Sequence, residues 1–259
     1  MLVASMPTWT HVDKMFAHGQ LYGFVALLAL LTPVTASPPL FVDQDSSSLT
    51  TTTMTSLAKV PVQLGVMSRC PDAMLCESVF DKVYKEVGDK IDLSAVYIAT
   101  WDPQEPVYGV KCMHGKAECE GNIQQLCVAK HSPQSNWWNF LQCQNYQGRN
   151  TISDLKKAEE CAKSANVPWK DKVEACIGMA DREGGRVPEG ITLLQESVRL
   201  SYDLDIEKSC TIIINKKPVC IHDGGWKQCE GGHQVSDFVR QINEEYDRLN
   251  RGGISLHIS

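Results

Sequence analysis

The stretch Cys112–Cys127, which reads C-M-H-G-K-A-E-C-E-G-N-I-Q-Q-L-C, brings together three cysteines, a His-Gly pair and an asparagine. Gly115 can adopt a positive φ, which predicts a loop at the start of the stretch. From Lys116 to Ala129 the pattern predicts a helix, because four residues recur at spacings that place them on one face: Cys119, Ile123, Leu126 and Cys127. We therefore expect a loop that leads into a helix, with cysteines in both.

Two kinds of site could use the cysteines of this stretch. A zinc ion could be held by Cys112, His114, Cys119 and Cys127, but their spacings do not match the closely spaced ligand pairs of structural zinc sites. We therefore favour disulfides that clamp the loop to the helix. We interpret His114 as a residue that holds the turn by hydrogen bonds rather than as a general base.

Seven residues of the stretch resemble the signature C-Q-H-G-x2-E-C-x2-N-x4-C of the gamma-interferon-inducible lysosomal thiol reductase (GILT) family: Cys112, His114, Gly115, Glu118, Cys119, Asn122 and Cys127. Met113 departs from the glutamine that the family carries. The resemblance extends over about residues 60–250. It implies a thioredoxin-like fold, thiol–disulfide exchange on protein disulfides, and paired cysteines in a helical insertion, to which Cys161 and Cys176 correspond.

The composition points to an oxidising compartment. The chain has 259 residues, enough for one sizeable domain or two small ones, and a net charge of -6. This charge, without a basic stripe, gives no support for nucleic-acid binding. The 11 cysteines favour several disulfides, and their odd number leaves at least one cysteine outside the pairs that the chain can form with itself.

The N-terminal region predicts entry into the secretory pathway. The apolar run Leu21–Leu31 is too short to span a bilayer and is typical of the hydrophobic part of a signal peptide. Small residues at Val34–Ala36 favour cleavage before Ser37, so we expect residues 1–36 to be a signal peptide or, alternatively, an uncleaved anchor. Residues 37–58 are rich in Ser, Thr and Pro and predict a flexible linker. The expected destination is extracellular, lysosomal or vacuolar.

The rest of the chain has the element order of an α/β thioredoxin-like fold. A strand over Val60–Val66, a helix from Pro71 to about Gly88 and a strand from Ile91 to Ile98 predict a β-α-β unit. Interrupted helical patterns follow, and then a hairpin and a last amphipathic helix: Pro168–Met179 and Leu193–Leu204, Thr211–Ile214 and Pro218–Ile221, and Val235–Leu249. We expect one domain over residues 59–252, with a disulfide-stabilised helical insertion at about 130–205.

Cys70 lies at the start of the first predicted helix, where a thioredoxin-like fold has its redox site. Unpaired N–H groups and the positive end of the helix dipole stabilise a thiolate, which is the attacking species in thiol–disulfide exchange. Arg69 adds positive charge beside it. The alternative is that Cys70 is one half of a structural disulfide.

The family carries C-x-x-C at this place, often C-P-D-C, whereas this chain has Cys70-Pro71-Asp72-Ala73. Alanine thus replaces the cysteine that would resolve a mixed disulfide. The next thiol is Cys76, but six residues along a helix separate the Cα atoms by about 10 Å, beyond the roughly 7 Å that a disulfide spans. We therefore expect Cys70 and Cys76 to pair only if the first helical turn unwinds.

Cys210 marks a second departure from the family. The family carries a proline, expected to be cis, just before the third strand, and the corresponding run here is Cys210–Lys216. Because that loop abuts the active-site thiol in the fold, we hypothesise that Cys70 and Cys210 face each other and form a disulfide or a two-thiolate metal or cluster site. Alternatively, Cys210 pairs elsewhere, for example with Cys220 or Cys229.

The leading hypothesis is a GILT-like thiol–disulfide oxidoreductase that acts on protein disulfides through Cys70, with Cys76 and Cys210 as further candidate catalytic cysteines. Because Ala73 cannot resolve the mixed disulfide, its release would need an external thiol, Cys210 or a rearranged Cys76. The alternative is a non-catalytic, secreted, disulfide-rich domain of the same fold that binds protein partners.

The remaining cysteines are candidates for structural disulfides: Cys143, Cys161, Cys176, Cys220 and Cys229. His222 and His233 flank Cys229, and we interpret this region as a cysteine-clamped loop rather than a metal site. No cofactor motif is present. We expect no cofactor, no metal, no nucleic-acid partner, no membrane contact beyond the signal segment, and a monomer whose partners are disulfide-containing proteins.

Overall fold

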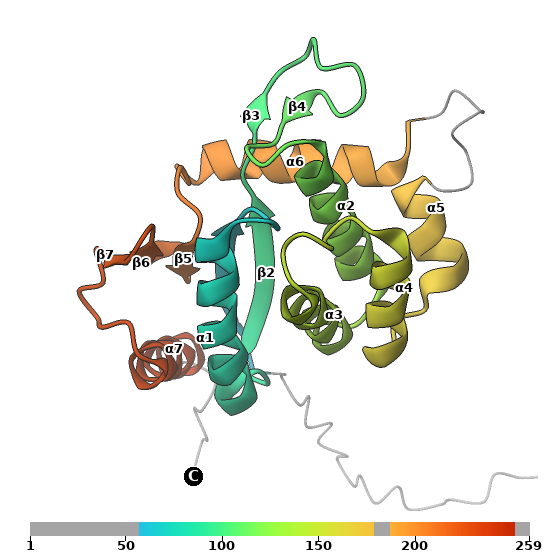
Figure 1. The fold of residues 1–259 in the computed structure, drawn as a ribbon. Coiled ribbons are helices and arrows are strands. Elements are labelled where there is room, and N and C mark those ends of the chain that lie inside the picture. Colours follow the sequence, from blue (N-terminus) through green and yellow to red (C-terminus); the bar gives the residue numbers. More distant parts are fainter. Residues whose placement is uncertain (1–56, 179–186, 252–259) are drawn as a thin grey trace, which may run out of the picture. The chain divides into compact units, whose positions relative to one another are not determined.

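The computed structural model describes residues 57–178 and 187–251, which Figure 1 draws in colour. The predicted signal peptide (1–36) and nearly all of the predicted linker (37–58) lie outside the described residues. None of the helices in the described part is long and apolar enough to cross a membrane.

A five-stranded sheet in the order β2-β1-β5-β6-β7 forms the centre of the fold. It begins with β1 (Val60–Val66), α1 (Pro71–Val87) and β2 (Ile91–Tyr97), and the two strands run parallel. β1 is an inner strand, and its alternate residues Val60, Val62, Leu64 and Val66 are all buried. A parallel pair joined by a helix, followed by antiparallel strands, is the topology of a thioredoxin-like fold. The predicted fold class is thus confirmed.

The C-terminal half of the sheet is an antiparallel hairpin with a short extension. β5 (Thr211–Ile214) pairs with β1, and β6 (Lys217–His222) and β7 (Trp226–Lys227) follow outward. The hairpin turns at Asn215 and Lys216, whose φ values of 46° and 66° suit a two-residue turn. β7 was not predicted, because two residues are too few to show the alternation of a strand.

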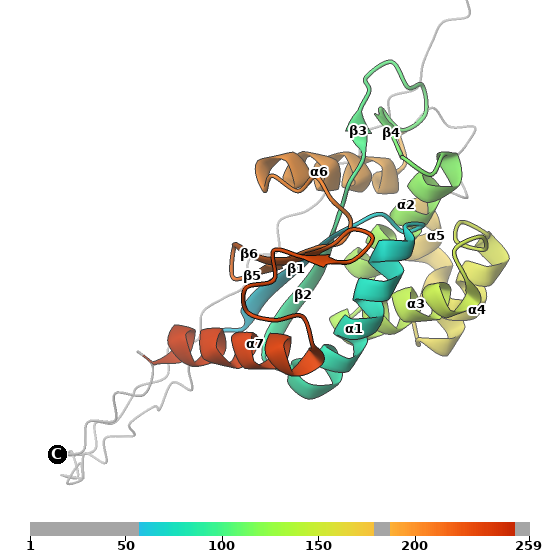
Figure 2. The same ribbon diagram turned by 60° about the vertical axis from the view of Figure 1, so that its left-hand side comes forward.

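Helices pack on both faces of the sheet (Figure 2). On one face α7 (Val235–Asn250) packs against α1, and the rings of Phe80 and Phe238 have centroids 5.0 Å apart. On the other face α6 (Glu189–Asp203) packs against β2. α1 is therefore enclosed by the sheet and α7, which fixes where its N-terminal turn lies.

Between β2 and β5 the chain forms a small hairpin and then a helical region, grouped beside the sheet in Figure 1. Its elements in order are β3 (Thr100–Trp101), β4 (Val110–Lys111), α2 (Lys116–His131), α3 (Gln134–Gln147), α4 (Leu155–Ser164), the kinked turn η1 (Trp169–Val173), α5 (Glu174–Ile177) and α6. Trp137 and Trp138 of α3 are buried in its core.

The continuous helix predicted over Pro168–Met179 is wrong. The backbone leaves helical angles at Lys170 and Asp171, where φ is 69° at Asp171, and only α5 is regular. Gly178 then ends α5 with a φ of 83°, a value that glycine adopts without strain. Trp169, Val173 and Cys176 are all buried at helix-like spacing, so the apolar pattern alone conceals the kink.

Candidate active site

Cys70 is the N-cap residue of α1, with φ −80° and ψ 126°, and its carbonyl accepts a hydrogen bond from Met74 N at 3.1 Å. Pro71 occupies the start of the helix, where its fixed φ fits and no N–H is lost. No side chain forms a capping hydrogen bond with the first turn. Cys70 therefore lies at the N-terminal end of α1, where the sequence predicted the redox thiol.

The Cys70 thiol faces the segment that precedes β5. Its Sγ lies 3.9 Å from Ser209 O, and the side chain is 5% exposed. Ser209 Oγ accepts a hydrogen bond from Met67 N at 3.1 Å, so the loop before Cys70 is joined to the same segment. The next peptide bond, Ser209–Cys210, is cis. The loop before α1 and the loop before β5 thus meet at the thiol.

Cys210 is bonded to Cys76, with Cα atoms 6.3 Å apart, and Cys70 is unbonded. The hypothesis of a Cys70–Cys210 disulfide or two-thiolate site is therefore wrong, and so is the alternative in which Cys210 pairs with Cys220 or Cys229, which are bonded to each other. The reason is geometric. Cys76 lies on the inner face of α1, fully buried against the start of β5, whereas Cys70 lies at the end of the helix.

All 11 cysteines lie within the described residues, and among them Cys70 is the one without a disulfide. The other four disulfides are Cys112–Cys119, Cys127–Cys176, Cys143–Cys161 and Cys220–Cys229. Cys161 and Cys176 are each bonded to another helix rather than to each other. The zinc alternative for the Cys112–Cys127 stretch does not hold, because all three of its cysteines are bonded.

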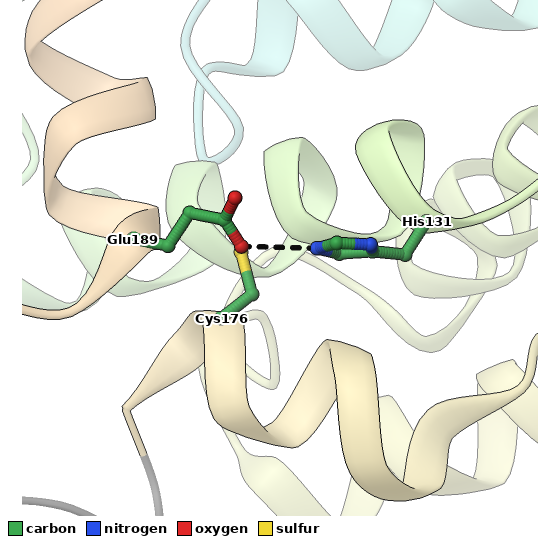
Figure 3. Close-up of side chains that lie close together, drawn as sticks. All are labelled: His131, Cys176 and Glu189. Carbon is green, nitrogen blue, oxygen red and sulfur yellow. Dashed lines mark hydrogen bonds and ion pairs between the residues drawn. The ribbon is translucent and has the colours of Figure 1, made fainter. Parts of the chain in front are cut away.

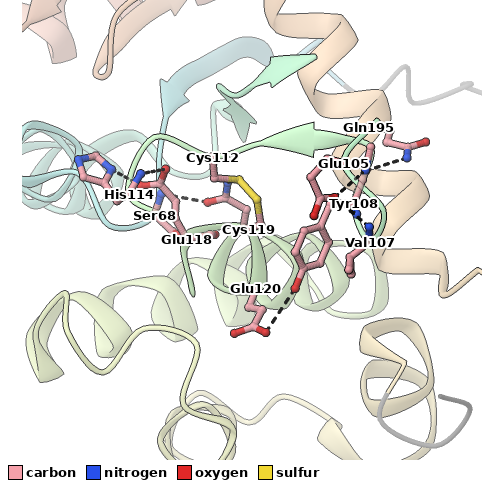
Figure 4. Close-up of a disulfide and its surroundings, with 12 residues drawn as sticks. Ser68, Glu105, Val107, Tyr108, Cys112, His114, Glu118, Cys119, Glu120 and Gln195 are labelled. Atoms are coloured by element: carbon pink, nitrogen blue, oxygen red, sulfur yellow. Dashed lines mark hydrogen bonds and ion pairs between the residues drawn. A yellow bond between two sulfur atoms is a disulfide. The ribbon is translucent and has the colours of Figure 1, made fainter. Parts of the chain in front are cut away.

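Four of the signature residues, Cys112, His114, Glu118 and Cys119, lie together at the start of α2 (Figure 4). The Cys112–Cys119 disulfide closes the loop onto the helix, with Cα atoms 5.7 Å apart. Glu118 is fully buried, accepts a hydrogen bond from His114 N at 3.1 Å through Oε1, and contacts His114 Nδ1 through Oε2. His114 thus holds the turn, with a buried carboxylate as its partner.

The same turn holds the loop that leads into Cys70. Asn122 Oδ1 accepts a hydrogen bond from Ser68 N at 3.0 Å, and Ser68 Oγ donates to Glu118 O at 3.2 Å. Gly121 permits this approach, because a Cβ there would lie 2.7 Å from Ser68 Oγ. The structure therefore links the signature to the reactive thiol through Ser68. Sequence reasoning missed Ser68, which lies 54 residues from Asn122 and belongs to no motif.

A second contact joins the first turn of α1 to β6. Asp72 Oδ1 lies 2.7 Å from His222 Nδ1 and accepts a hydrogen bond from Gly224 N at 2.9 Å. His222 exchanges both backbone hydrogen bonds with Cys210, each 2.8 Å long. Asp72 therefore ties the helix end that carries Cys70 to the strand beside Cys210. Neither Asp72 nor His222 was predicted to have this role.

The loop after β6 is closed by the Cys220–Cys229 disulfide. Within it Trp226 meets His222 edge-on at 4.8 Å between ring centroids and stacks on His233 at 5.4 Å. The two histidines pack on the indole, and the Cys229 sulfur is bonded to Cys220. This matches a cysteine-clamped loop.

One cluster has the composition of a metal site, in the helical region (Figure 3). His131 of α2, Cys176 of α5 and Glu189 of α6 lie close together. The Cys176 sulfur is bonded to Cys127 and is not a thiolate, so it lacks the charge that makes cysteine a metal ligand. Glu189 instead pairs with Lys130 at 2.5 Å and His131 at 3.0 Å, and these hydrogen bonds lower its pKa.

Glu77, next to Cys76 on α1, is a buried carboxyl that sequence reasoning missed. Burial raises its pKa to about 8, while the hydrogen bond from Asn145 Nδ2 to Glu77 Oε2, 2.6 Å long, acts in the opposite direction. The pKa of the buried Tyr97 hydroxyl is raised by its own burial and then by Glu77. Burial therefore favours the protonated form of the Glu77 carboxyl.

These observations define the class of protein: a thioredoxin-like fold with one unbonded thiol at the N-terminus of its first helix. The model of the family described as gamma interferon inducible lysosomal thiol reductase (GILT) matches residues 61–165. The matched segment, which is less than half of the chain, contains Cys70 and the whole Cys112–Cys127 stretch. Over residues 61–165 the chain is thus similar to the family that the signature resembles, and Cys210 lies outside them.

Similar proteins were found by sequence and by structure. GILT-like protein 1 of Drosophila melanogaster is 24% identical over 140 residues, which are 49% of this chain and 56% of the relative. The chain thus spans about half the length of this relative. MdbA, a thiol-disulfide oxidoreductase from Corynebacterium diphtheriae, aligns at 16% identity and a TM-score of 0.48 over 71% of this chain and 83% of its own. BdbD from Bacillus subtilis aligns at 17% identity and a TM-score of 0.48 over 74% of this chain and 91% of its own.

Proposed function

We propose that this protein is a thiol–disulfide oxidoreductase that acts on protein disulfides through Cys70. The observation that carries the proposal is that the single unbonded cysteine among the described residues, which hold all 11, is the N-cap residue of α1. A helix N-terminus stabilises the thiolate that attacks a disulfide. The match of residues 61–165 to the thiol reductase family gives independent support.

The first chemical step follows from the position of Cys70. Its thiolate attacks one sulfur of a substrate disulfide, so that a Cys70–substrate bond forms and the second substrate sulfur leaves as a thiolate. Ala73 lies where a resolving cysteine would be, and its methyl group cannot complete the exchange. The mixed disulfide must therefore be resolved by another thiol, which makes the active site a monothiol site at this step.

A pocket that includes Met67 of the loop before Cys70 offers a place for the substrate chain. It has a volume of about 260 Å³, and its lining includes Met67 of the loop before Cys70, Met113 of the Cys112–Cys127 stretch, and Ile206 of the segment that leads to Cys210. Met113 is 76% exposed, so its side chain is accessible to a bound chain. We propose that the substrate protein binds here through an extended apolar segment next to its target disulfide. We also propose that this protein acts as a monomer.

The five disulfides fit an oxidising compartment. Within that class of compartments we propose the secretory route, with an extracellular, lysosomal or vacuolar destination. The apolar run Leu21–Leu31 is the basis for a signal peptide.

A non-catalytic domain that binds protein partners is the second candidate. It is favoured by the low exposure of Cys70, 5%, together with the absence of a cysteine at Ala73. In that case the buried Cys70 thiol would not react with protein disulfides.

Reduction of insulin disulfides by the mature protein, with a small thiol as reductant, separates the two functions. We expect Cys70→Ser to lose the activity completely. Leu75→Ala, an exposed position on the same helix, is the matched control and keeps it. An unreactive wild-type protein, or a Cys70→Ser variant that equals the wild type, would refute the enzyme proposal.

A further inference from the structure

The position of the Cys76–Cys210 disulfide raises the question of what reaches it. Both cysteines are fully buried, so neither a protein substrate nor a solvent reductant touches their sulfurs directly. The one unbonded thiol in the part of the chain that the structure describes, Cys70, lies at the edge of the same site. Its Sγ is 3.9 Å from the carbonyl oxygen of Ser209, the residue joined to Cys210.

From this arrangement we propose that Cys70, Cys210 and Cys76 form a three-cysteine relay, in which Cys210 resolves the mixed disulfide on Cys70 and Cys76 then regenerates Cys70. The proposal rests on the proposed function of Cys70 as the nucleophile. It assigns to the buried pair the task that C-x-x-C performs in a dithiol site, now distributed over α1 and the start of β5.

Geometry decides the order of the steps. Cys70 and Cys76 are six residues apart on an intact helix, with Cα atoms about 10 Å apart, which is too far for a direct disulfide. Cys210 is the middle member, since its Cα lies 6.3 Å from that of Cys76 while its neighbouring carbonyl contacts the Cys70 sulfur. Exchange between the ends of the relay must therefore pass through the Cys210 sulfur.

The relay balances as three exchanges that start from reduced Cys76 and Cys210. Cys70 first forms a bond to one substrate sulfur and releases the other as a thiolate. The Cys210 thiolate then attacks the Cys70 sulfur, so that Cys70–Cys210 forms and the second substrate thiolate leaves. The Cys76 thiolate finally attacks the Cys210 sulfur, so that Cys76–Cys210 forms and Cys70 is released as a thiolate.

In this sequence the substrate disulfide gains two electrons from the Cys76/Cys210 dithiol, and two protons follow to the substrate thiolates. The bonding seen here, Cys76–Cys210 with Cys70 unbonded, is the state after one complete turnover. A small-molecule thiol regenerates the reduced protein. The Cys70 thiolate first attacks the Cys210 sulfur, so that Cys70–Cys210 forms and Cys76 is released as a thiol. Two molecules of the small thiol then reduce Cys70–Cys210, which leaves all three cysteines as thiols and joins the two small thiols in a disulfide.

The contacts around Cys210 suit a shuttling sulfur on a fixed backbone. Cys210 N and O are both hydrogen-bonded to His222 at 2.8 Å, and Asp72 ties His222 to the first turn of α1. The backbones that carry Cys70 and Cys210 are therefore held together whichever disulfide is present.

Single-turnover reduction of a synthetic peptide disulfide, with a fluorophore on one half and a quencher on the other, tests the relay. The protein is reduced with dithiothreitol, freed of it, mixed with one equivalent of the probe, and mapped by alkylation and mass spectrometry. In the wild type we expect both peptide halves to be released, Cys76–Cys210 to be re-formed and Cys70 to carry the alkyl label.

The decisive variant is Cys76→Ala/Cys210→Ala, with melting by circular dichroism to establish that it folds. We expect it to release one peptide half as fast as the wild type and to keep the other bonded to Cys70, a complete loss of resolution. Release of the second half at the wild-type rate would overturn the relay and leave Cys70 as a monothiol nucleophile. If the wild type leaves the probe intact, the proposed function fails as well.

A measurement on the wild type alone covers the case in which the double variant does not fold. Alkylation at successive times after mixing should show Cys210 losing its thiol as the second peptide half appears, with the loss of the Cys76 thiol at the same time or later. If the probe is consumed while Cys76 and Cys210 both remain thiols, the pair takes no part in turnover and the relay is wrong.

Discussion

At the scale of single residues, buried polar side chains decide where the Cys70 thiol lies. Ser68, two residues before Cys70, is held by Asn122 Oδ1 and by the carbonyl of Glu118, and all three residues are buried. A buried N–H without a partner costs about 1–3 kcal/mol, so an apolar residue in place of Asn122 should destabilise the fold by about this amount. The signature asparagine thereby positions a thiol that is far away in the sequence.

Asn122→Ala should lower the free energy of unfolding by about 1–3 kcal/mol, because Ser68 N loses its acceptor. It should also speed the alkylation of Cys70 by iodoacetamide, since the loop that encloses the thiol is released. Urea unfolding and timed alkylation measure both effects. Asn139→Ala on α3, an exposed position, is the control and should change neither. An Asn122→Ala variant with unchanged stability and labelling would contradict the positioning role.

Glu77 should make the protein most stable in acid. Its pKa is raised from 4.5 to about 8 in the folded state, so the folded protein binds a proton that the unfolded chain releases over this range. Stability should therefore fall by about 1.4 kcal/mol per pH unit between about pH 5 and 8, and this contribution should level off above pH 8.

Urea unfolding at a series of pH values, with the disulfides intact, measures this slope. Glu77→Gln should remove it, because an amide does not ionise. Glu86→Gln, at an exposed position of the same helix, should leave it in place. A Glu77→Gln variant with the wild-type slope would show that other groups cause the pH dependence.

Neither of these residue roles could be predicted from the sequence. Glu77 follows Cys76 in a helix in which no other charged residue is buried, and its carboxylate is hydrogen-bonded to Asn145 of α3. Ser68 and Asn122 are brought together only when α2 packs beside the loop before α1. In contrast, the position of Cys70 followed from local information alone, since Pro71 and the apolar spacing that follows mark a helix start.

At the scale of elements, the N-terminal turn of α1 is held from two directions. Asn122 of α2 is hydrogen-bonded to Ser68 in the loop before α1. On the other side, Asp72 of α1 contacts His222 at the end of β6 and accepts a hydrogen bond from Gly224. The Cys112–Cys119 disulfide supports the first of these contacts, because it closes the loop before α2 onto that helix. The effects of removing this bond should therefore reach Cys70.

Cys112→Ser/Cys119→Ser should destabilise the protein by about 2–3 kcal/mol, the chain-entropy value for a loop with a sequence separation of 7. It should also change the alkylation rate of Cys70. Cys143→Ser/Cys161→Ser, which opens a separation of 18 between α3 and α4, should destabilise by about 3 kcal/mol and leave that rate unchanged. Equal labelling in the two double variants would contradict a link from α2 to the thiol.

At the scale of the whole molecule, the fold could be predicted because its β-α-β unit and its last helix have clear periodicities. Val60–Val66 and Ile91–Tyr97 were recognisable as strands, and the hairpin at Asn215–Lys216 as a turn. The disulfide connectivity could not be predicted, since Cys76 and Cys210 are separated by 134 residues and meet only in the folded chain. The prediction that Cys70 bonds Cys210 failed because Cys76, fully buried on α1, is the partner of Cys210.

The central claim is that the molecule holds one reactive thiol beside a buried disulfide that can exchange with it. Disulfide mapping of the native, unreduced protein by alkylation with iodoacetamide and mass spectrometry tests this claim most directly. We expect Cys70 alone to take the label and the peptides of Cys76 and Cys210 to be found joined. Cys70 found bonded to another cysteine, or Cys76 and Cys210 found as separate labelled thiols, would contradict it.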